Sequence, residues 1–129
     1  MHQCVLCMGS NVEGESILKQ VFNILSNHFD SVRASRIMKT QAIGEQYLSP
    51  FHNQVLAVTT SLESTEIKRI CKQIEKDFGR LPEDKAKGIV KLDIDLILYD
   101  TECLKPKDIC LPYVQEGIKQ ITNTKQKSL

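Results

Sequence analysis

The sequence VKLDIDLILY at residues 90–99 decides the fold, because it alternates as a strand with two unlike sides does. Successive side chains of a strand point to opposite faces of a sheet. One face of this stretch is wholly apolar and comprises Val90, Leu92, Ile94, Leu96 and Leu98. The other face comprises Lys91, Asp93, Asp95, Ile97 and Tyr99. The pattern predicts a strand that buries the first face in a core and presents two carboxylates on the second.

The chain before this strand contains three extended and two helical segments. Segments 3–8, 31–39 and 51–60 are apolar or alternating, which predicts strands. Apolar residues recur at helical spacing after Glu15 and again in 67–78, which predicts two helices. The order strand, helix, strand, strand, helix, strand predicts an α+β fold. We expect a ferredoxin-like βαββαβ sandwich, with two helices on one face of an antiparallel sheet and a C-terminal extension.

Length and charge limit the organisation and the partners of the chain. Its 129 residues predict a single domain over residues 1–129, a usual size for one hydrophobic core. A weak helical pattern covers 113–121, and the polar residues 122–129 are expected to form a frayed, disordered tail. Lysine and arginine total 17 against 16 aspartate and glutamate, so no general attraction to nucleic acid or to an anionic membrane is expected. The sequence does not indicate an oligomeric state.

Two further observations favour a cytoplasmic protein. No apolar run approaches the length of a membrane span, and residues 1–10 lack the features of a secretory signal. The five cysteines are odd in number and mostly lie in apolar stretches. They are expected to be reduced core residues rather than a disulfide framework.

Asp93 and Asp95 are the most informative polar pair in the sequence. Residues two apart on a strand share a face, so the two carboxylates are expected to lie within reach of a shared cation. Such hard oxygen ligands suit Mg²⁺, which takes one or two protein carboxylates and completes its shell with water and phosphate oxygens. From the spacing alone, a solvated acidic strand face is the more common explanation.

The two acids close a series of motifs that runs through the chain. The series contains Gly9-Ser10-Asn11, Thr40, Gly44, Phe51-His52-Asn53, Ile74-Glu75, Gly79-Arg80 and Leu92-Asp93-Ile94-Asp95. Over residues 3–121 the chain resembles the 6-hydroxymethyl-7,8-dihydropterin pyrophosphokinases of folate synthesis. The resemblance implies transfer of diphosphate from ATP to the dihydropterin with release of AMP, and two Mg²⁺ ions that bridge the triphosphate.

The resemblance also implies a role for individual side chains. It assigns the metal ions to Asp93 and Asp95, and it places Arg80 in the catalytic set as well as at the nucleotide. The residues expected to bind the pterin are Thr40, Ile43, Gly44, Phe51 and Asn53. The residues expected at the nucleotide are Glu75, Arg80, Lys85, Lys87, Lys91 and Lys119. Without the resemblance, Arg80 reads as a solvated cation at a helix end, and Phe51 and Asn53 as ordinary core and strand residues.

Several positions depart from the family pattern. Lys87 and Val90 stand where the family has a tryptophan and an arginine, Tyr113 stands for a histidine, and Ile121 for an aromatic residue that stacks on the pterin. Each lost charged hydrogen bond in a closed site costs on the order of 2 to 4 kcal/mol of transition-state stabilisation. Two alternatives follow: an enzyme with weakened activity, or a catalytically degenerate relative that binds pterin, nucleotide or a protein partner.

RNA binding is a further alternative, since RNA-recognition domains share this order of elements. Those domains stack bases on aromatic residues of their central strands. Segment 3–8 contains no aromatic residue, and the acids of the last strand would repel phosphate in the absence of a metal. The sequence therefore disfavours RNA as a partner.

Overall fold

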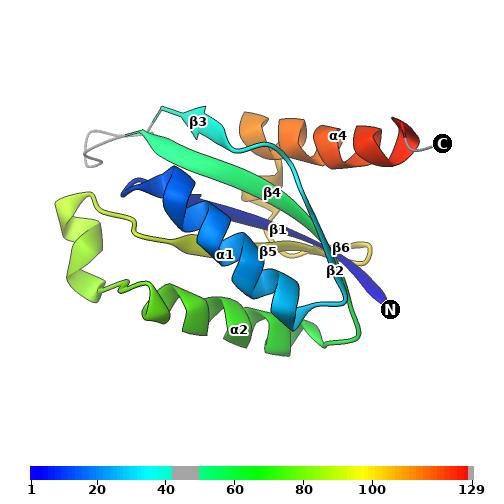
Figure 1. Cartoon of the computed structure of the whole chain (residues 1–129), viewed down its shortest axis with the longest axis horizontal. Helices are drawn as coiled ribbons and strands as arrows, with labels where there is room; N and C mark the ends of the chain where they lie inside the picture. The colour runs from blue at the N-terminus through cyan, green and yellow to red at the C-terminus, as the bar shows by residue number, and fades with distance from the viewer. Residues whose placement is uncertain (42–49, 128–129) are drawn as a thin grey trace.

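The computed structural model of the chain describes residues 1–41 and 50–127. Its centre is a six-stranded antiparallel sheet with the order β2-β4-β1-β5-β6, in which β3 also pairs with β4 (Figure 1). The strands are β1 (His2–Ser10), β2 (Ser31–Ala34), β3 (Met38–Thr40), β4 (Phe51–Thr60), β5 (Asp93–Tyr99) and β6 (Glu102–Cys103). The helices are α1 (Gly14–His28), α2 (Ser64–Asp77), α3 (Pro106–Ile109) and α4 (Pro112–Lys127), with a 3-10 helix, η1 (Pro82–Lys87). The ferredoxin-like arrangement expected from the sequence is confirmed.

The extended segment expected at 31–39 is divided into β2 and β3. Ser35 interrupts the ladder to β4, because its hydroxyl oxygen accepts the backbone N–H of Val55 at 3.0 Å. The backbone N–H of Ser35 in turn donates to the Val55 carbonyl at 2.9 Å. A side chain thus replaces one backbone partner, and the ladder to β4 is interrupted between the two short strands.

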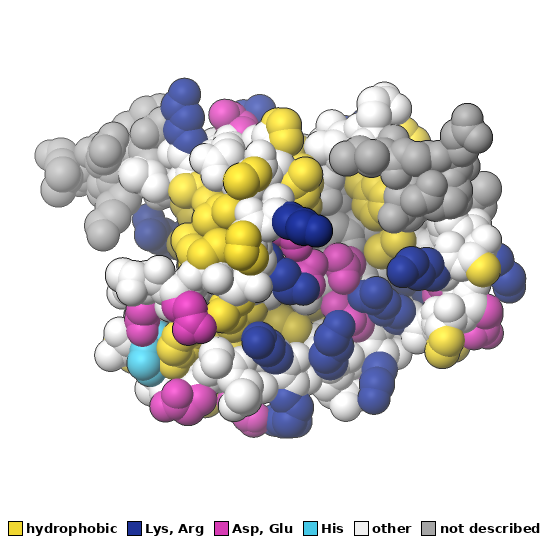
Figure 2. All heavy atoms as spheres, turned by 180° about the vertical axis from the view of Figure 1, so that it is seen from behind, with side chains coloured by type: hydrophobic (Ala, Val, Ile, Leu, Met, Phe, Trp, Pro, Cys, Tyr) yellow, Lys and Arg dark blue, Asp and Glu magenta, His cyan; other side chains and the backbone are white. Residues whose placement is uncertain are grey.

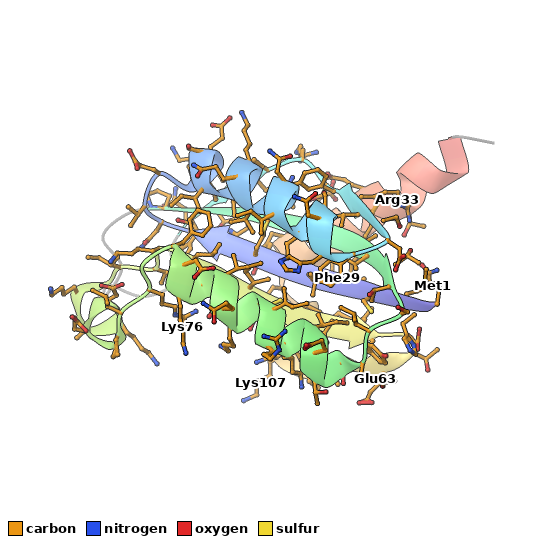
Figure 3. All side chains as sticks on the ribbon, turned by 60° about the horizontal axis from the view of Figure 1, so that its bottom comes forward. Met1, Phe29, Arg33, Glu63, Lys76 and Lys107 are labelled. Atoms are coloured by element: carbon orange, nitrogen blue, oxygen red, sulfur yellow. The ribbon has the colours of Figure 1, made fainter. Side chains whose placement is uncertain are left out.

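The main core lies between one face of the sheet and the helices α1 and α2, which lie beside each other on this face (Figure 3). Alternate residues of the central strands point into it, as the periodicity predicted. The sheet contributes Cys4, Leu6, Met8, Leu56, Val58, Ile94 and Leu96, together with Leu92 directly before β5. The helical side contributes Leu18, Val21 and Leu25 of α1, Phe29 directly after it, and Ile67, Ile70, Cys71 and Ile74 of α2. This packing fixes β5 with its odd-numbered residues on the opposite face as far as Ile97.

The predicted alternation of β5 fails after Leu96. Val5 of β1 pairs with Leu98 and Leu6 with Leu96, so a bulge leaves Ile97 as an extra residue. As a result Leu98 packs with Ile97 on the second face, whereas Tyr99 packs with the main core. The prediction that Leu98 shares the face of Leu96 was therefore wrong.

Helix α4 covers part of the second face of the sheet. Cys7, Val55 and Ile97 of the sheet pack there against Val114 and Ile121 of the helix. A Cβ on Gly117 would overlap the Val55 side chain, so glycine permits this close approach. The helix continues to Lys127, beyond Thr122 where the frayed tail was expected to begin, and no proline or glycine interrupts residues 118–127. Asp93 and Asp95 lie on the same face of the sheet, in a cavity that Tyr113 from the first turn of α4 also lines.

The cysteines and helices bear on two further expectations. All five cysteines are free; Cys4, Cys7 and Cys71 are buried as expected, whereas Cys103 and Cys110 are exposed. Within the described part of the chain, no helix combines the length and the apolar character that crossing a membrane requires.

Candidate active site

Two adjoining cavities lie at the end of the sheet where β1 finishes and β5 starts. The first has a volume of about 340 Å³, and its lining includes Cys7, Gly9, Thr40, Phe51, Asn53, Asp93, Asp95 and Tyr113. The second has a volume of about 320 Å³, and its lining includes Phe51, Arg80, Lys85, Val90 and Asp93. Figure 2, which views the molecule from behind, shows Asp and Glu side chains gathered near the middle of this face with Lys and Arg side chains around them. Phe51 and Asp93 belong to both linings, so they form the boundary between the cavities.

The two carboxylates of β5 lie together at this boundary. Asp93 pairs across the sheet with Gly9 and Asp95 with Cys7, which places both on the face opposite the main core. The pKa of Asp95 is raised to about 7, first because the group is buried and then because the charge of Asp93 is adjacent. The Lys105 ammonium lies 3.9 Å from Asp95 and offsets this only in part. Two carboxylates held this closely favour a shared proton or a bound cation.

The two carboxylates at this position suit Mg²⁺ better than a metal ion whose ligands all come from protein side chains. Among residues 1–41 and 50–127, no group of three or more His, Cys, Asp or Glu side chains is arranged to hold a metal ion. Mg²⁺ is commonly bound by one or two carboxylates and takes its remaining ligands from water and phosphate. A cation bound to Asp93 and Asp95 would therefore take its other oxygen ligands from water or from a phosphate in the cavities.

Glu75 and Arg80 connect α2 to the carboxylate pair. Gly79 ends α2 with a φ of +85°, a left-handed conformation that favours glycine and turns the chain back toward β5. Arg80 then lies 3.0 Å from the Glu75 carboxylate and donates a hydrogen bond of 2.9 Å to Asp93. Glu75 is only 2% exposed, and its second oxygen accepts the backbone N–H of Ile94 at 2.8 Å. The expected nucleotide residue Glu75 thus holds the backbone between the two acids and lines neither cavity, whereas Arg80 lines the second.

Asn53 and Thr40 meet in the first cavity. The Asn53 amide donates a hydrogen bond of 2.6 Å to the Thr40 hydroxyl, and Asn53 is only 5% exposed. A Cβ at Gly9 would lie 2.5 Å from the Asn53 side-chain oxygen, so glycine makes room for the amide. Of the other residues expected at the pterin, Phe51 lines the same cavity, and Ile43 and Gly44 lie outside the described residues.

The segment around η1 lines the second cavity and is held in place by side-chain hydrogen bonds from neighbouring residues. The Asn11 side chain donates to the Gly88 carbonyl at 2.9 Å and accepts the Val90 N–H at 2.7 Å. Lys91 donates to the Gly79 carbonyl at 2.8 Å and lies 3.4 Å from the buried carboxylate of Asp84. Lys91 was expected at the nucleotide, but its ammonium is engaged by these contacts within the segment, and Lys91 lines neither cavity.

The remaining expected lysines divide between the cavity and the surface. Lys85 lines the second cavity, as a phosphate-binding cation would. Lys87 and Lys119 are exposed and line neither cavity. The first cavity also contains Leu111 and Tyr113, from the segment that returns after β6. Sequence reasoning missed Leu111 and treated Tyr113 only as the loss of a histidine; its place in the family pattern was the available signal.

Comparison with known proteins places the sequence of this chain in one family. The family model described as 7,8-dihydro-6-hydroxymethylpterin-pyrophosphokinase (HPPK) matches residues 5–122. The chain is similar to 2-amino-4-hydroxy-6-hydroxymethyldihydropteridine pyrophosphokinases from three bacteria. The identity is 27% for Bacillus subtilis, 30% for Aquifex aeolicus and 29% for Helicobacter pylori. These matches cover 84%, 84% and 87% of this chain and 66%, 68% and 71% of the relatives, so the chain spans about two thirds of their length.

Proposed function

The chain belongs to the 7,8-dihydro-6-hydroxymethylpterin-pyrophosphokinase family, and from this membership we propose that it transfers diphosphate from ATP to 6-hydroxymethyl-7,8-dihydropterin and releases AMP. One observation carries the proposal: two cavities of similar size meet at Asp93, beside a second carboxylate and an arginine. This arrangement suits a reaction in which two substrates must come into contact near a divalent cation.

We assign the first cavity to the pterin. Asn53 and Thr40 present hydrogen-bonding groups at its wall, and Phe51 presents an aromatic face. A flat heterocycle with an amide edge matches these groups, because the edge can exchange hydrogen bonds with Asn53 while the ring stacks on Phe51. The expectation that Ile43 and Gly44 also contact the pterin stays a prediction.

We assign the second cavity to the triphosphate of ATP. Arg80 and Lys85 supply positive charge there, and Asp93 lies at the boundary with the first cavity. Asp93 and Asp95 would hold Mg²⁺, with two ions expected from the family. When bound, Mg²⁺ supplies positive charge that stabilises the phosphate oxygens during transfer. The chain's own part is to orient the pterin hydroxyl toward the β-phosphorus and to keep the reactants aligned.

An assay of AMP release tests the proposed function. With ATP and Mg²⁺, the purified chain is expected to release AMP only after the dihydropterin is added, and EDTA is expected to abolish the release. The rate is expected to be low for the family, because Lys87 and Val90 lack the side chains found at those positions. Calorimetry with the pterin and a non-hydrolysable ATP analogue separates the alternatives. Binding without AMP release indicates the degenerate relative, and binding of neither ligand indicates a protein-interaction module.

Replacing Asn53 by Ala is expected to weaken dihydropterin binding about 10- to 100-fold, because buried polar groups of the ligand edge lose their partner at a cost of about 1 to 3 kcal/mol. Affinity for the ATP analogue is expected to stay within twofold, since Asn53 lines only the first cavity. Isothermal titration with each ligand measures both. Asn23→Ala, an exposed change on α1, is the matched control. Equal losses for both ligands, or no loss for either, would contradict the assignment of the first cavity.

A further inference from the structure

A third groove lies beside α1, on the face of the sheet that the two long helices α1 and α2 cover. It has a volume of about 390 Å³. Gln54 lines it from β4 and pairs across the sheet with Met8 of the main core, so the glutamine side chain lies on that face. The rest of the lining includes Lys19, Phe22, Ala34 and Ile37. These residues line neither the first nor the second cavity, so the proposed reaction does not involve the groove.

Gln54 brings an unsatisfied hydrogen-bond acceptor to this groove. The residue is only 8% exposed, and its amide nitrogen donates a hydrogen bond of 2.8 Å to the Ser35 carbonyl. The amide oxygen Oε1 accepts none. Over residues 1–41 and 50–127 it is the one buried side-chain nitrogen or oxygen without a partner. Buried polar atoms are nearly always paired, because an unpaired one has lost its hydrogen bonds to water. The oxygen therefore points to a donor supplied by another molecule.

The bond to Ser35 fixes the orientation of the Gln54 amide. Exchanging the amide nitrogen and oxygen would set an acceptor against the Ser35 carbonyl, so the nitrogen belongs there and the oxygen points away from it. The oxygen is covered by neighbouring atoms. A donor therefore reaches it only after side chains at the rim move. Lys19 is an exposed residue of the rim, and exposed side chains change rotamer within picoseconds to nanoseconds.

The walls of the groove decide what kind of molecule suits it. Phe22 and Ile37 are partly buried against the main core and present an aromatic and an aliphatic surface. At the rim the Lys19 ammonium lies 3.3 Å from the Glu15 carboxylate, so the two charges balance and an ionic ligand gains little there. The volume lies in the range of small-molecule sites. A flat, neutral molecule with one hydrogen-bond donor matches these properties.

We propose that the third groove binds a small neutral aromatic molecule, whose N–H or O–H group donates to Gln54 Oε1 while its ring packs on Phe22. The inference does not depend on the proposed function, because its test uses neither ATP nor pterin. Indole is a suitable probe, since it carries a single N–H donor on a flat ring system. Benzofuran has nearly the same shape with an oxygen in place of the N–H. The pair therefore isolates the effect of the donor.

An NMR titration of the isotope-labelled full chain with indole tests the site. Saturable shifts are expected at the Gln54 side-chain amide and at the backbone amides of Phe22 and Ile37, with a Kd of about 1 mM or lower. Benzofuran is expected to bind about 3- to 10-fold more weakly, the effect of one neutral hydrogen bond. Equal affinities for the two probes would overturn the proposal. So would the absence of saturable shifts at these residues, the result expected if only water enters the groove.

Two variants test the acceptor and the space separately. Gln54→Met keeps the length of the side chain without the acceptor, so indole is expected to bind it only as tightly as benzofuran does. Ala34→Leu keeps Gln54 and fills the groove from an exposed position, so both probes are expected to bind about 10-fold more weakly.

Ala86→Leu is the matched control, because it makes the same exchange at an exposed position outside the groove and is expected to keep wild-type affinity for both probes. If Gln54→Met does not fold, the comparison of Ala34→Leu with Ala86→Leu decides. Wild-type affinities in Ala34→Leu, or an undiminished preference for indole in a folded Gln54→Met variant, overturn the proposal.

Discussion

Replacing Asp95 by Asn is expected to lower kcat for AMP release at least about 10³-fold, because one of two proposed Mg²⁺ ligands is lost and about 4 kcal/mol of transition-state stabilisation is lost with it. Asp93→Asn is expected to act similarly, since Asp93 lies at the boundary of both cavities. Steady-state AMP release at saturating Mg²⁺ measures the effect. Asp77→Asn is the control, because Asp77 lies at the end of α2, lines neither cavity, and accepts a side-chain hydrogen bond of 2.9 Å from Gln73.

The same Asp95→Asn change is expected to stabilise the metal-free protein. The pKa of Asp95 is raised to about 7 in the folded chain from an ordinary value of 3.8. Between these values the folded state keeps a proton that the unfolded state releases, so wild-type stability falls as pH rises from about 4 to 7. The asparagine variant lacks this fall. Its advantage in unfolding midpoint should therefore grow across that window and stay level above it.

Thermal unfolding in EDTA, followed by addition of Mg²⁺ with the ATP analogue, measures this opposite effect. Ligand addition is expected to raise the wild-type midpoint and to leave the Asp95→Asn midpoint nearly unchanged, because binding to the native state stabilises only a competent site. An Asp95→Asn variant with wild-type AMP release, or one that responds to the ligands as the wild type does, would refute the assignment of this carboxylate.

Replacing Arg80 by Met is expected to lower kcat/KM for ATP about 10²-fold, since a charged donor to phosphate oxygens is worth roughly 3 kcal/mol in the transition state. The unfolding free energy is expected to fall by about 1 to 2 kcal/mol as well, because the buried Glu75 carboxylate loses its closest cation. After the change, Lys72 at 3.5 Å is the one ion-pair partner that Glu75 keeps among residues 1–41 and 50–127. Kinetics and urea unfolding of one variant therefore report two separate roles.

A double substitution separates these two roles of Arg80. Glu75→Gln keeps an oxygen acceptor for the Ile94 N–H and removes the buried charge, so combined with Arg80→Met it is expected to recover stability. Activity is not expected to recover, because the phosphates still lack the guanidinium. Arg80→Lys is expected to recover only part of the activity, since an ammonium lacks the planar fork. Near wild-type kcat/KM in the double variant would mean that Arg80 only neutralises Glu75.

Predictions from the sequence were most accurate where they rested on a repeating pattern of apolar residues. Alternation in 90–99 predicted the face of Asp93 and Asp95, since burial of Leu92, Ile94 and Leu96 leaves the acids no other side. The same pattern failed at Leu98, because a bulge depends on pairing with β1 and adds a residue that periodicity does not register. The path of the chain after β5 could not be predicted from periodicity either, so Leu111 was missed at the first cavity.

By itself the sequence determined the order of the elements, the faces of the central strands and the pairing of the two acids, because these follow from side-chain spacing along a regular backbone. Only the tertiary structure decided which charged side chains line the two cavities. Glu75 and Lys91 look like cleft residues in the sequence, yet they bond to backbone groups of Ile94 and Gly79. Such contacts depend on how a helix ends and how distant segments meet. They therefore produce no periodic pattern in the sequence.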